Sequence, residues 1–394
     1  MKDASPLLLA VFGLVAIGPL GCSSPESSGS SGSGGAAAAG GIAGASGNNA
    51  KGGAQAMAGT AGVSGTAGGG GIPAVDGGGG SGGGAPAGGT AGTGGSAGIG
   101  GGLAIGGSSG TGGAASSCST GDPVFAGAGD IATNGGAQSQ TADILDMLFP
   151  MSAPACAGTV FTAGDNAYSN GTLNQFNMYF DPTWGKHKAR MRPTPGNHDY
   201  GTANAAGYFD YFNGVGVMTG PAGERGKGYY SYDVGAWHMI AINSNCSAIG
   251  GCNPGSPQET WLRADLTATT AKCVLAYWHH PRFSSGTNHG DAVEMQPIWQ
   301  ALYDSDADVV ISGHDHEYER FGPQTPTGTA DASRGMVEFV VGTGGAGLYT
   351  CGTLEATSIK CDNTSHGVLK LTLHPTSYDF EFIPIVGDTF TDSG

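Results

Sequence analysis

Several short stretches of the chain end on side chains of the kinds that bind metal ions in proteins. Each stretch lies directly after a run of apolar residues or a Pro-Gly turn. The candidate ligands are Asp130, Asp165, the motif GNHD at 196–199, His279 or His280, and the motif GHDH at 313–316. Carboxylate, amide and imidazole groups without thiolates suit iron, manganese or zinc. The sequence therefore predicts a metal site that uses no cysteine ligand.

These groups are more numerous than one metal ion requires, whereas two ions bridged by a shared carboxylate would use them all. Two-metal sites activate water and stabilise both oxygens of a displacement at phosphorus. Taken alone, a Gly-Asp pair after a strand is commonly a turn or helix cap, and GNHD is commonly a loop. GHDH is more specific, because histidines two residues apart at a strand end point the same way, although a structural histidine pair is the competing interpretation. The ordered set favours a two-metal centre.

The segments that carry these groups alternate between predicted strands and predicted helices. Four apolar runs are continuous rather than alternating, which is typical of buried parallel strands: residues 124–130, 159–165, 273–280 and 307–316. Apolar residues recur at helical spacing in residues 138–149, 257–271 and 295–306. In open α/β sheets, sites form at the carboxyl ends of the strands, which is where the candidate ligands stand.

Other segments predict a second sheet. Residues 227–244 contain two β-rich runs on either side of Asp233-Val234-Gly235, which is typical of an antiparallel hairpin. Residues 335–345 and 366–384 also have the composition of strands. We therefore expect an α/β fold of the mixed type, in which two sheets form a β-sandwich flanked by helices.

The N-terminus predicts export. Lys2 precedes an apolar run at residues 7–20 that ends in Gly21-Cys22. A run of this length suits the core of a signal peptide, here residues 1–22, and is too short to span a bilayer. Cysteine after a small residue resembles the bacterial lipoprotein cleavage site, although Pro19 replaces the usual leucine. We expect a lipoprotein held at the cell envelope through a lipid on Cys22, and plain secretion is the alternative.

Composition separates a linker from a folded domain. Residues 23–117 consist almost entirely of Gly, Ala, Ser and Thr, with no apolar period, which predicts a disordered linker. Residues 118–394 remain as the expected catalytic domain. The formal net charge of -16 disfavours a nucleic acid polymer as partner. It does not disfavour a small phosphorylated substrate, because bound metal ions reverse the charge locally.

The chain contains 8 cysteines, and an exported chain of this kind is expected to form disulfides. Cys246 and Cys252 flank a tight loop and are expected to pair, as are Cys351 and Cys361 across a second loop. If Cys22 is lipidated, the remaining cysteines are Cys118, Cys156 and Cys273, and one of these three is unpaired.

The ordered motifs GD, GDxxY, GNH, HxP and GHxH resemble those of the calcineurin-like metallophosphoesterases, and within them the purple acid phosphatases. The resemblance covers about residues 124–345. Many relatives carry D-x-H in the first motif, whereas this chain has Asp130-Ile131-Ala132. The acid-phosphatase branch also lacks that histidine and supplies a tyrosine from the second motif, which is the position of Tyr168. The alternative for Tyr168 is an aromatic side chain packed under the loop.

The resemblance implies a ligand set for each of two metal ions. A first ion, Fe(III) in this branch, would take Asp130, Asp165, Tyr168 and His316. A second, divalent ion (Fe, Zn or Mn) would take Asp165 as the bridge, Asn197, His279 and His314. His279 is preferred over His280 because the family motif places one residue between the ligand and the proline, here Pro281.

The resemblance also implies the catalytic residues. His198 would hydrogen-bond the phosphoryl group, with its ring oriented by Asp199. His289, ten residues after His279, would protonate the leaving group, a role that requires imidazolium and therefore acid to near-neutral pH. The implied activity is hydrolysis of phosphate monoesters by attack of a metal-bound hydroxide. A phosphodiesterase or nucleotide hydrolase on the same centre is one alternative, and a tethered binding protein with a relic site is another. Residues 200–225 show no interpretable pattern.

Overall fold

The computed structural model describes residues 121–151 and 158–394. The predicted signal peptide, its cysteine Cys22 and the predicted linker lie outside the described residues, as do Cys118 and Cys156. Within the described part of the chain, no helix is both long and apolar enough to cross a membrane.

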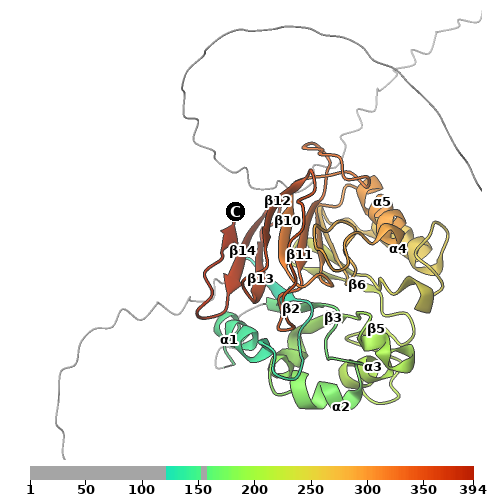
Figure 1. The fold of residues 1–394 in the computed structure, drawn as a ribbon. Helices are drawn as coiled ribbons and strands as arrows, with labels where there is room; N and C mark the ends of the chain where they lie inside the picture. The colour runs from blue at the N-terminus through green and yellow to red at the C-terminus, as the bar shows by residue number, and fades with distance from the viewer. Residues whose placement is uncertain (1–120, 152–157) are drawn as a thin grey trace, which may run out of the picture. The chain divides into compact units, whose positions relative to one another are not determined.

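Two main sheets form the centre of the described domain (Figure 1). In the first sheet, β1, β2 and β3 are parallel, and a C-terminal hairpin pairs antiparallel with β1. The strand order is β15 (Asp392–Ser393), β14 (Tyr378–Pro384), β13 (Gly367–Leu373), β1 (Val124–Ala128), β2 (Gly158–Ala163), β3 (Met191–Thr194).

The second sheet is also mixed. Its parallel strands are β7, β8, β9 and β11, and antiparallel strands extend both of its edges. The strand order is β12 (Ser358–Asp362), β10 (Tyr318–Phe321), β11 (Val337–Val341), β9 (Val309–Ser312), β8 (Cys273–Tyr277), β7 (Trp237–Ala241), β6 (Tyr230–Val234). A separate short ribbon pairs β4 (Thr219–Gly220) with β5 (Gly223–Glu224).

The two sheets pack face to face on a common core. Phe125 of β1 and Phe161 of β2 stack with ring centroids 4.7 Å apart, and Tyr277 of β8 packs edge-on against Phe125 at 5.6 Å. The Tyr277 hydroxyl crosses the interface and donates to the Arg192 carbonyl at 3.1 Å. Burial of these large rings fixes the distance between the sheets.

Helices cover the outer faces of both sheets. Against the first sheet pack α1 (Gln138–Leu148), α2 (Leu173–Gln175), α3 (Ala206–Phe212) and the short turns η1 (Phe176–Phe180) and η2 (Trp184–Arg190). Against the second pack α4 (Pro257–Ala268) and α5 (Gln296–Asp304). The start of α4 follows from its sequence, because the Ser256 side chain accepts from Glu259 N and proline occupies the first turn. The remaining short turns are η3 (Asp199–Gly201), η4 (Ala203–Ala205), η5 (Cys246–Ala248) and η6 (Val293–Met295).

The predicted fold class is confirmed, because the structure is a two-sheet mixed β-sandwich flanked by helices. The predicted parallel strands divide between the sheets: β1 and β2 lie in one, and β8 and β9 in the other. Residues 227–244 contain the predicted antiparallel hairpin, β6 and β7. The uninterpretable residues 200–225 contain α3 and the short β4–β5 ribbon.

The two predicted disulfides are present. Cys246 pairs with Cys252, and Cys351 pairs with Cys361. Cys273 is disulfide-bonded as well, so it is not the unpaired cysteine that the sequence left open.

One histidine ties the hairpin to α4 away from the candidate ligands. His238 on β7 contacts Asp265 through Nε2 and Asp233 through Nδ1, each at 2.8 Å. The pKa of His238 is raised above its ordinary value, chiefly by the hydrogen bond to Asp265, while burial opposes the shift. Because the pKa is raised, the contacts of protonated His238 with the two aspartates stabilise the fold fully below the unfolded-state pKa, about 6.5. It is then lost as the pH rises through the folded-state value.

We expect His238→Gln to lower the free energy of unfolding by roughly 1–2 kcal/mol near pH 5, with a smaller penalty near pH 8. Chemical denaturation at a series of pH values measures this difference. Ser231→Ala is the matched control, because it removes only a neutral donor, at 2.7 Å from the other oxygen of Asp265. If His238→Gln lowers the free energy of unfolding equally at every pH, a charged His238 between the two aspartates is contradicted.

Candidate metal centre

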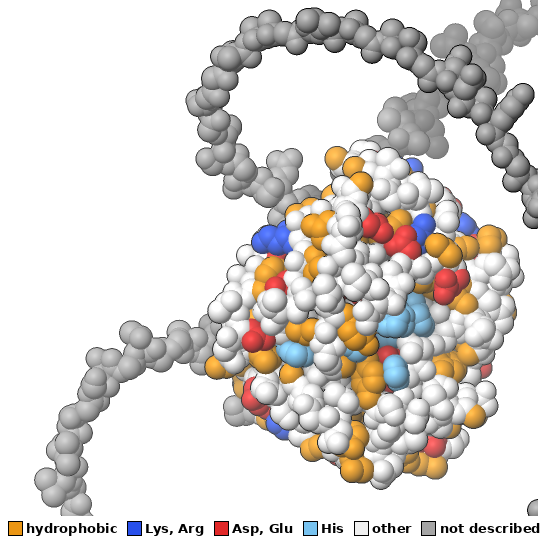
Figure 2. All heavy atoms as spheres, viewed as in Figure 1, with side chains coloured by type: hydrophobic (Ala, Val, Ile, Leu, Met, Phe, Trp, Pro, Cys, Tyr) orange, Lys and Arg blue, Asp and Glu red, His pale blue; other side chains and the backbone are white. Residues whose placement is uncertain are grey.

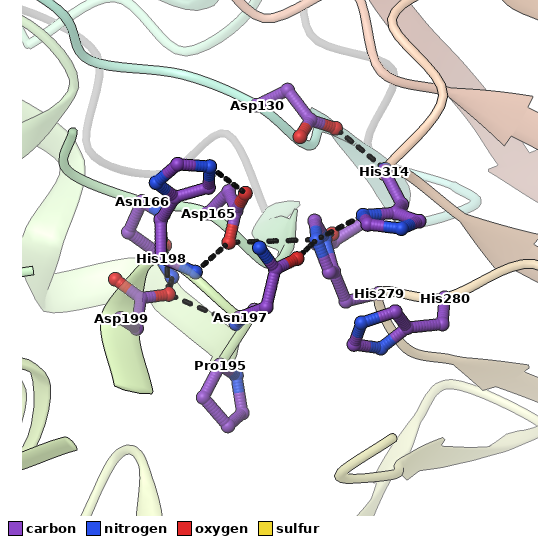
Figure 3. Close-up of polar contacts among 12 residues, drawn as sticks. Asp130, Asp165, Asn166, Pro195, Asn197, His198, Asp199, His279, His280 and His314 are labelled. Atoms are coloured by element: carbon purple, nitrogen blue, oxygen red, sulfur yellow. Dashed lines mark hydrogen bonds and ion pairs between the residues drawn. The ribbon is translucent and has the colours of Figure 1, made fainter. Parts of the chain in front are cut away.

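The candidate ligands follow the carboxyl ends of strands from both sheets. Asp130 comes after β1, Asp165 after β2, Asn197 after β3, His279 after β8 and His314 after β9. These ends meet at one place, where the side chains of Asp165, Asn197, His279 and His314 lie together (Figure 3). On the surface of the molecule, histidine side chains gather over this region (Figure 2).

Close backbone contact between the strand ends requires glycine at two points. A Cβ on Gly164 would lie 2.5 Å from Nδ1 of His279, and Gly164 itself has a φ of 81°. A Cβ on Gly313 would lie 2.7 Å from both the Ala163 carbonyl oxygen and Oδ2 of Asp130. Real Cβ atoms do not approach other atoms so closely, so the glycine before each ligand is a packing requirement.

Three of the ligand candidates adopt left-handed backbone conformations. The φ angles are 61° at Asp130, 47° at Asp165 and 72° at His314. Such angles are uncommon outside glycine, and residues held in them cluster at functional sites. Each residue turns the chain sharply after its strand, and this turn aims its side chain back across the sheet edge.

The first predicted ligand group converges around Asp130. The Tyr168 hydroxyl donates to Asp130 Oδ1 at 2.8 Å and lies 3.1 Å from Nε2 of His316. His316 Nε2 is 3.3 Å from the same carboxylate oxygen. Nδ1 of His316 donates to the Gly347 carbonyl at 2.7 Å, which leaves Nε2 as the acceptor that faces the site.

The second predicted group converges around His279. Its Nδ1 donates to the Ala163 carbonyl at 2.9 Å, so Nε2 faces the site. Around this Nε2 lie Oδ1 of Asn197 at 2.9 Å, Nδ1 of His314 at 3.1 Å and Oδ1 of Asp165 at 3.4 Å. Nδ1 of His280 contacts the Ser244 hydroxyl at 2.7 Å, and the His280 ring also lies against that of His314 with centroids 4.4 Å apart. The contacts of His279 with Asn197 and Asp165 support the choice of His279 over its neighbour.

Asp165 lies between the two groups and is almost completely buried. Burial alone would raise its pKa, but the adjacent His279 and the nearby His198 lower it to about 2. Burial likewise opposes the charged form of His279, whose pKa the Asp165 carboxylate nevertheless raises to about 9. Burial and the neighbouring His279 lower the pKa of His314. The field around Asp165 therefore favours one positive charge beside it.

Tyr168 remains a phenol in the field of the protein alone. Burial and the charges of Asp130 and Asp165 raise its pKa well above the ordinary value. A phenolate at this position would therefore require a cation close to the hydroxyl oxygen. The contacts with Asp130 and His316 also distinguish Tyr168 from an aromatic ring that only packs under the loop.

The structure assigns the orientation of His198 to a different group from the one predicted. Nδ1 of His198 lies 2.6 Å from the Ser169 carbonyl, and Nε2 lies 3.8 Å from Asp165 Oδ2. Asp199 instead accepts from the Asn166 side chain at 2.8 Å and from Gly196 N at 2.9 Å. The prediction that Asp199 orients the ring is therefore wrong, because this buried carboxyl fixes the GNHD turn. Burial raises its pKa to about 7.

His289 lies at the rim of the site. Its ring stacks on His314 with centroids 3.9 Å apart, and the residue is exposed to solvent. The histidine that was predicted from its spacing to His279 therefore presents an exposed imidazole next to the candidate ligands. His198 is also partly exposed, with its Nε2 3.8 Å from Asp165 Oδ2.

Two residues at the site were missed by sequence reasoning. Tyr349 stacks on His316 with centroids 3.9 Å apart and rings 8° from parallel. Asp315, between the two histidines of GHDH, is fully buried and contacts the loop that carries His289. The signal for Asp315 was a carboxylate inside the motif, whereas Tyr349 follows a glycine-rich turn that carries no pattern.

The fold and the donor set together define a class of protein. A family model described as calcineurin-like phosphoesterase matches residues 123–318, the span that contains every predicted ligand. The chain belongs to the calcineurin-like phosphoesterase family. Within it, the similarity is to purple acid phosphatases.

Purple acid phosphatase 18 of Arabidopsis thaliana is 30% identical over 237 residues, which cover 56% of this chain and 49% of the relative. The chain thus spans about half the length of the curated relatives it matches. Among solved structures, purple acid phosphatase PPD1 from yellow lupin seeds has a TM-score of 0.54 at 20% identity, covering 69% of this chain and 53% of that one. GAP50, described as the anchor in the inner membrane complex of Plasmodium, has a TM-score of 0.52 at 17% identity, covering 69% and 88%. These structures share the fold.

We expect Asp165→Asn to lose metal binding, because its carboxylate lies within reach of both predicted ligand groups. Metal content after dialysis and calorimetric titration with Mn²⁺ or Zn²⁺ measure the loss. Asp146→Asn is the control, since Asp146 lies on α1 and pairs with Lys186 at 3.0 Å. Full retention of metal by Asp165→Asn would exclude a bridging role.

Proposed function

We propose that this chain is an exported phosphatase of the purple acid phosphatase type, which hydrolyses phosphate monoesters at a dinuclear metal centre. The observation that carries the proposal is the convergence of the complete donor set, including Tyr168 against Asp130 and His316. Phosphate esters are the substrates that the family description names, and we propose a small one for this chain.

The residues present fit two metal ions. Nε2 of His279 offers at most one hydrogen, because Nδ1 already donates to a carbonyl, yet Oδ1 of Asn197, Oδ1 of Asp165 and Nδ1 of His314 all lie within 3.4 Å of it. An acceptor-rich cluster of this kind suits a cation better than a proton. We propose that Asp130, Tyr168 and His316 would hold Fe(III), that Asn197, His279 and His314 would hold divalent Fe, Zn or Mn, and that Asp165 would bridge them.

When bound, metal ions in such a centre supply an activated water and neutralise charge that develops on the phosphoryl oxygens. The chain's own residues position the substrate. Nε2 of His198 faces Asp165 because Nδ1 is held by the Ser169 carbonyl, and it can donate to a phosphoryl oxygen. His289, exposed at the rim, donates a proton to the ester oxygen as the bond between that oxygen and phosphorus breaks.

We also propose the organisation of the whole chain. Residues 1–22 direct export and end on a lipidated Cys22, residues 23–117 form a tether, and residues 118–394 form the catalytic domain. A tether of this composition and length would span roughly 55 Å root-mean-square. The lipid would hold the enzyme at the cell envelope while its site remains free to meet soluble phosphate esters.

The aerobically purified domain should show the visible charge-transfer band of a tyrosinate–Fe(III) pair, and Tyr168→Phe should remove the band while leaving a cooperative thermal transition. Absorption spectra and metal analysis on the same samples provide the measurement. A colourless wild-type protein with two bound metals would instead indicate a Mn or Zn phosphoesterase. A metal-free protein without activity would indicate a binding protein with a relic site.

His289→Ala should lower kcat/KM by ~100-fold for alkyl phosphates, whose leaving groups need a proton, and far less for nitrophenyl phosphate. Steady-state assays of both substrates, with a matched diester, give the comparison. His374→Ala is the control: this histidine pairs with Asp122 beyond the opposite end of β1, where Val124 pairs with Thr372. Equal losses on both esters would remove His289 as the acid, and faster turnover of the diester would replace the monoesterase assignment.

A further inference from the structure

The loop that carries His289 closes around one buried carboxylate. Asp315 is fully buried, and its Oδ1 accepts from the backbone N–H of His289 at 3.2 Å. Its Oδ2 accepts from Gly290 N at 2.9 Å and from the Ser284 hydroxyl at 2.6 Å. The Ser284 oxygen in turn accepts from Gly286 N at 3.0 Å. The carboxylate therefore fixes both ends of the segment from Ser284 to Gly290.

At Gly286 the loop lies so close to this carboxylate that no side chain fits there. A Cβ on Gly286 would lie 2.5 Å from the carboxyl carbon of Asp315. The loop has a second attachment, because Thr287 N donates to the Thr350 carbonyl at 3.1 Å. The backbone of His289 is therefore held in place even though its side chain is exposed to solvent.

The position of Asp315 in the chain explains why it can serve this loop. It lies between His314 and His316, whose rings face the metal-ligand side of the site. Its own carboxylate contacts residues of the loop and neither Asp130 nor Asp165. Residues 314–316 thus present two candidate ligands toward one side and the carboxylate that holds the loop toward the other. The His289 ring stacks on the His314 ring with centroids 3.9 Å apart.

Asparagine at this position would not replace the carboxylate. Asp315 accepts three hydrogen bonds with its two oxygens. An amide offers a single oxygen and turns an NH₂ group toward N–H or O–H donors. The loop would then lose at least one attachment while the volume of the side chain stays the same.

We propose that Asp315 is the positioning residue that holds His289 where it can reach the leaving group. This inference rests on the proposed function, in which His289 is the proton donor. Asp315 acts through the backbone of the loop, and substrate does not contact it.

The test is a double-mutant cycle on two substrates, an alkyl phosphate and nitrophenyl phosphate. Asp315→Asn should lower kcat/KM for the alkyl ester by at least ~10-fold and spare the aryl ester, following His289→Ala. The double variant should be no slower than His289→Ala alone. The metal content of Asp315→Asn should equal that of wild type. Asp331→Asn is the control, because Asp331 caps a surface turn at Ser333 and Arg334 in the same manner.

The outcomes separate the two ideas. A leaving-group effect in His289→Ala that is absent from Asp315→Asn, or losses that add in full in the double variant, would overturn the positioning role alone. Equal losses on both substrates in His289→Ala would overturn the acid assignment itself. If Asp315→Asn does not fold, Ser284→Ala removes one attachment and should show the same selectivity to a smaller degree. An unselective Ser284→Ala would then count against the inference.

Discussion

The close approach of backbone from the two sheets is the constraint on which the whole site depends. The segments that follow β1, β2 and β9 are in close contact. At Gly313 there is no space for a Cβ, because Ala163 and Asp130 lie against it. The ring core between the sheets, with Phe125 and Phe161 against Tyr277, holds this distance. Because the ligands follow directly after these contacts, side chains from separate sheets come within a few ångströms without long flexible arms.

The electrostatics of the site follow from this geometry. Burial removes water from Asp165, and the imidazoles around it replace the lost solvation, which lowers its pKa to about 2. The same carboxylate raises the pKa of His279 to about 9, so the imidazole carries a proton that a bound cation would displace. Tyr168 responds in the opposite sense, because its phenolate would add a negative charge to the same space. The field of the folded chain therefore sets the protonation of the candidate ligands.

Much of the strand framework and the candidate ligands could be predicted from the order of short motifs, because each motif combines a buried strand with the turn that ends it. The role of Asp199 could not, because its contacts with Asn166 and Gly196 depend on how two turns pack. Tyr349 escaped prediction for the same reason, since only the folded chain stacks it on His316. Residues 200–225 carry no clear period, and their short α3 and β4–β5 elements depend on tertiary contacts.

The fold alone does not decide between an enzyme and a binding protein. A lupin purple acid phosphatase and a Plasmodium protein described as an anchor both share it at TM-scores just above 0.5. The distinction lies in the side chains that could bind a metal ion. Nδ1 of both His279 and His316 is held by a backbone carbonyl, so each Nε2 faces the carboxylates of the site. An oriented set of carboxylate, amide and imidazole groups suits a bound cation, and a surface that only contacts another protein does not require one.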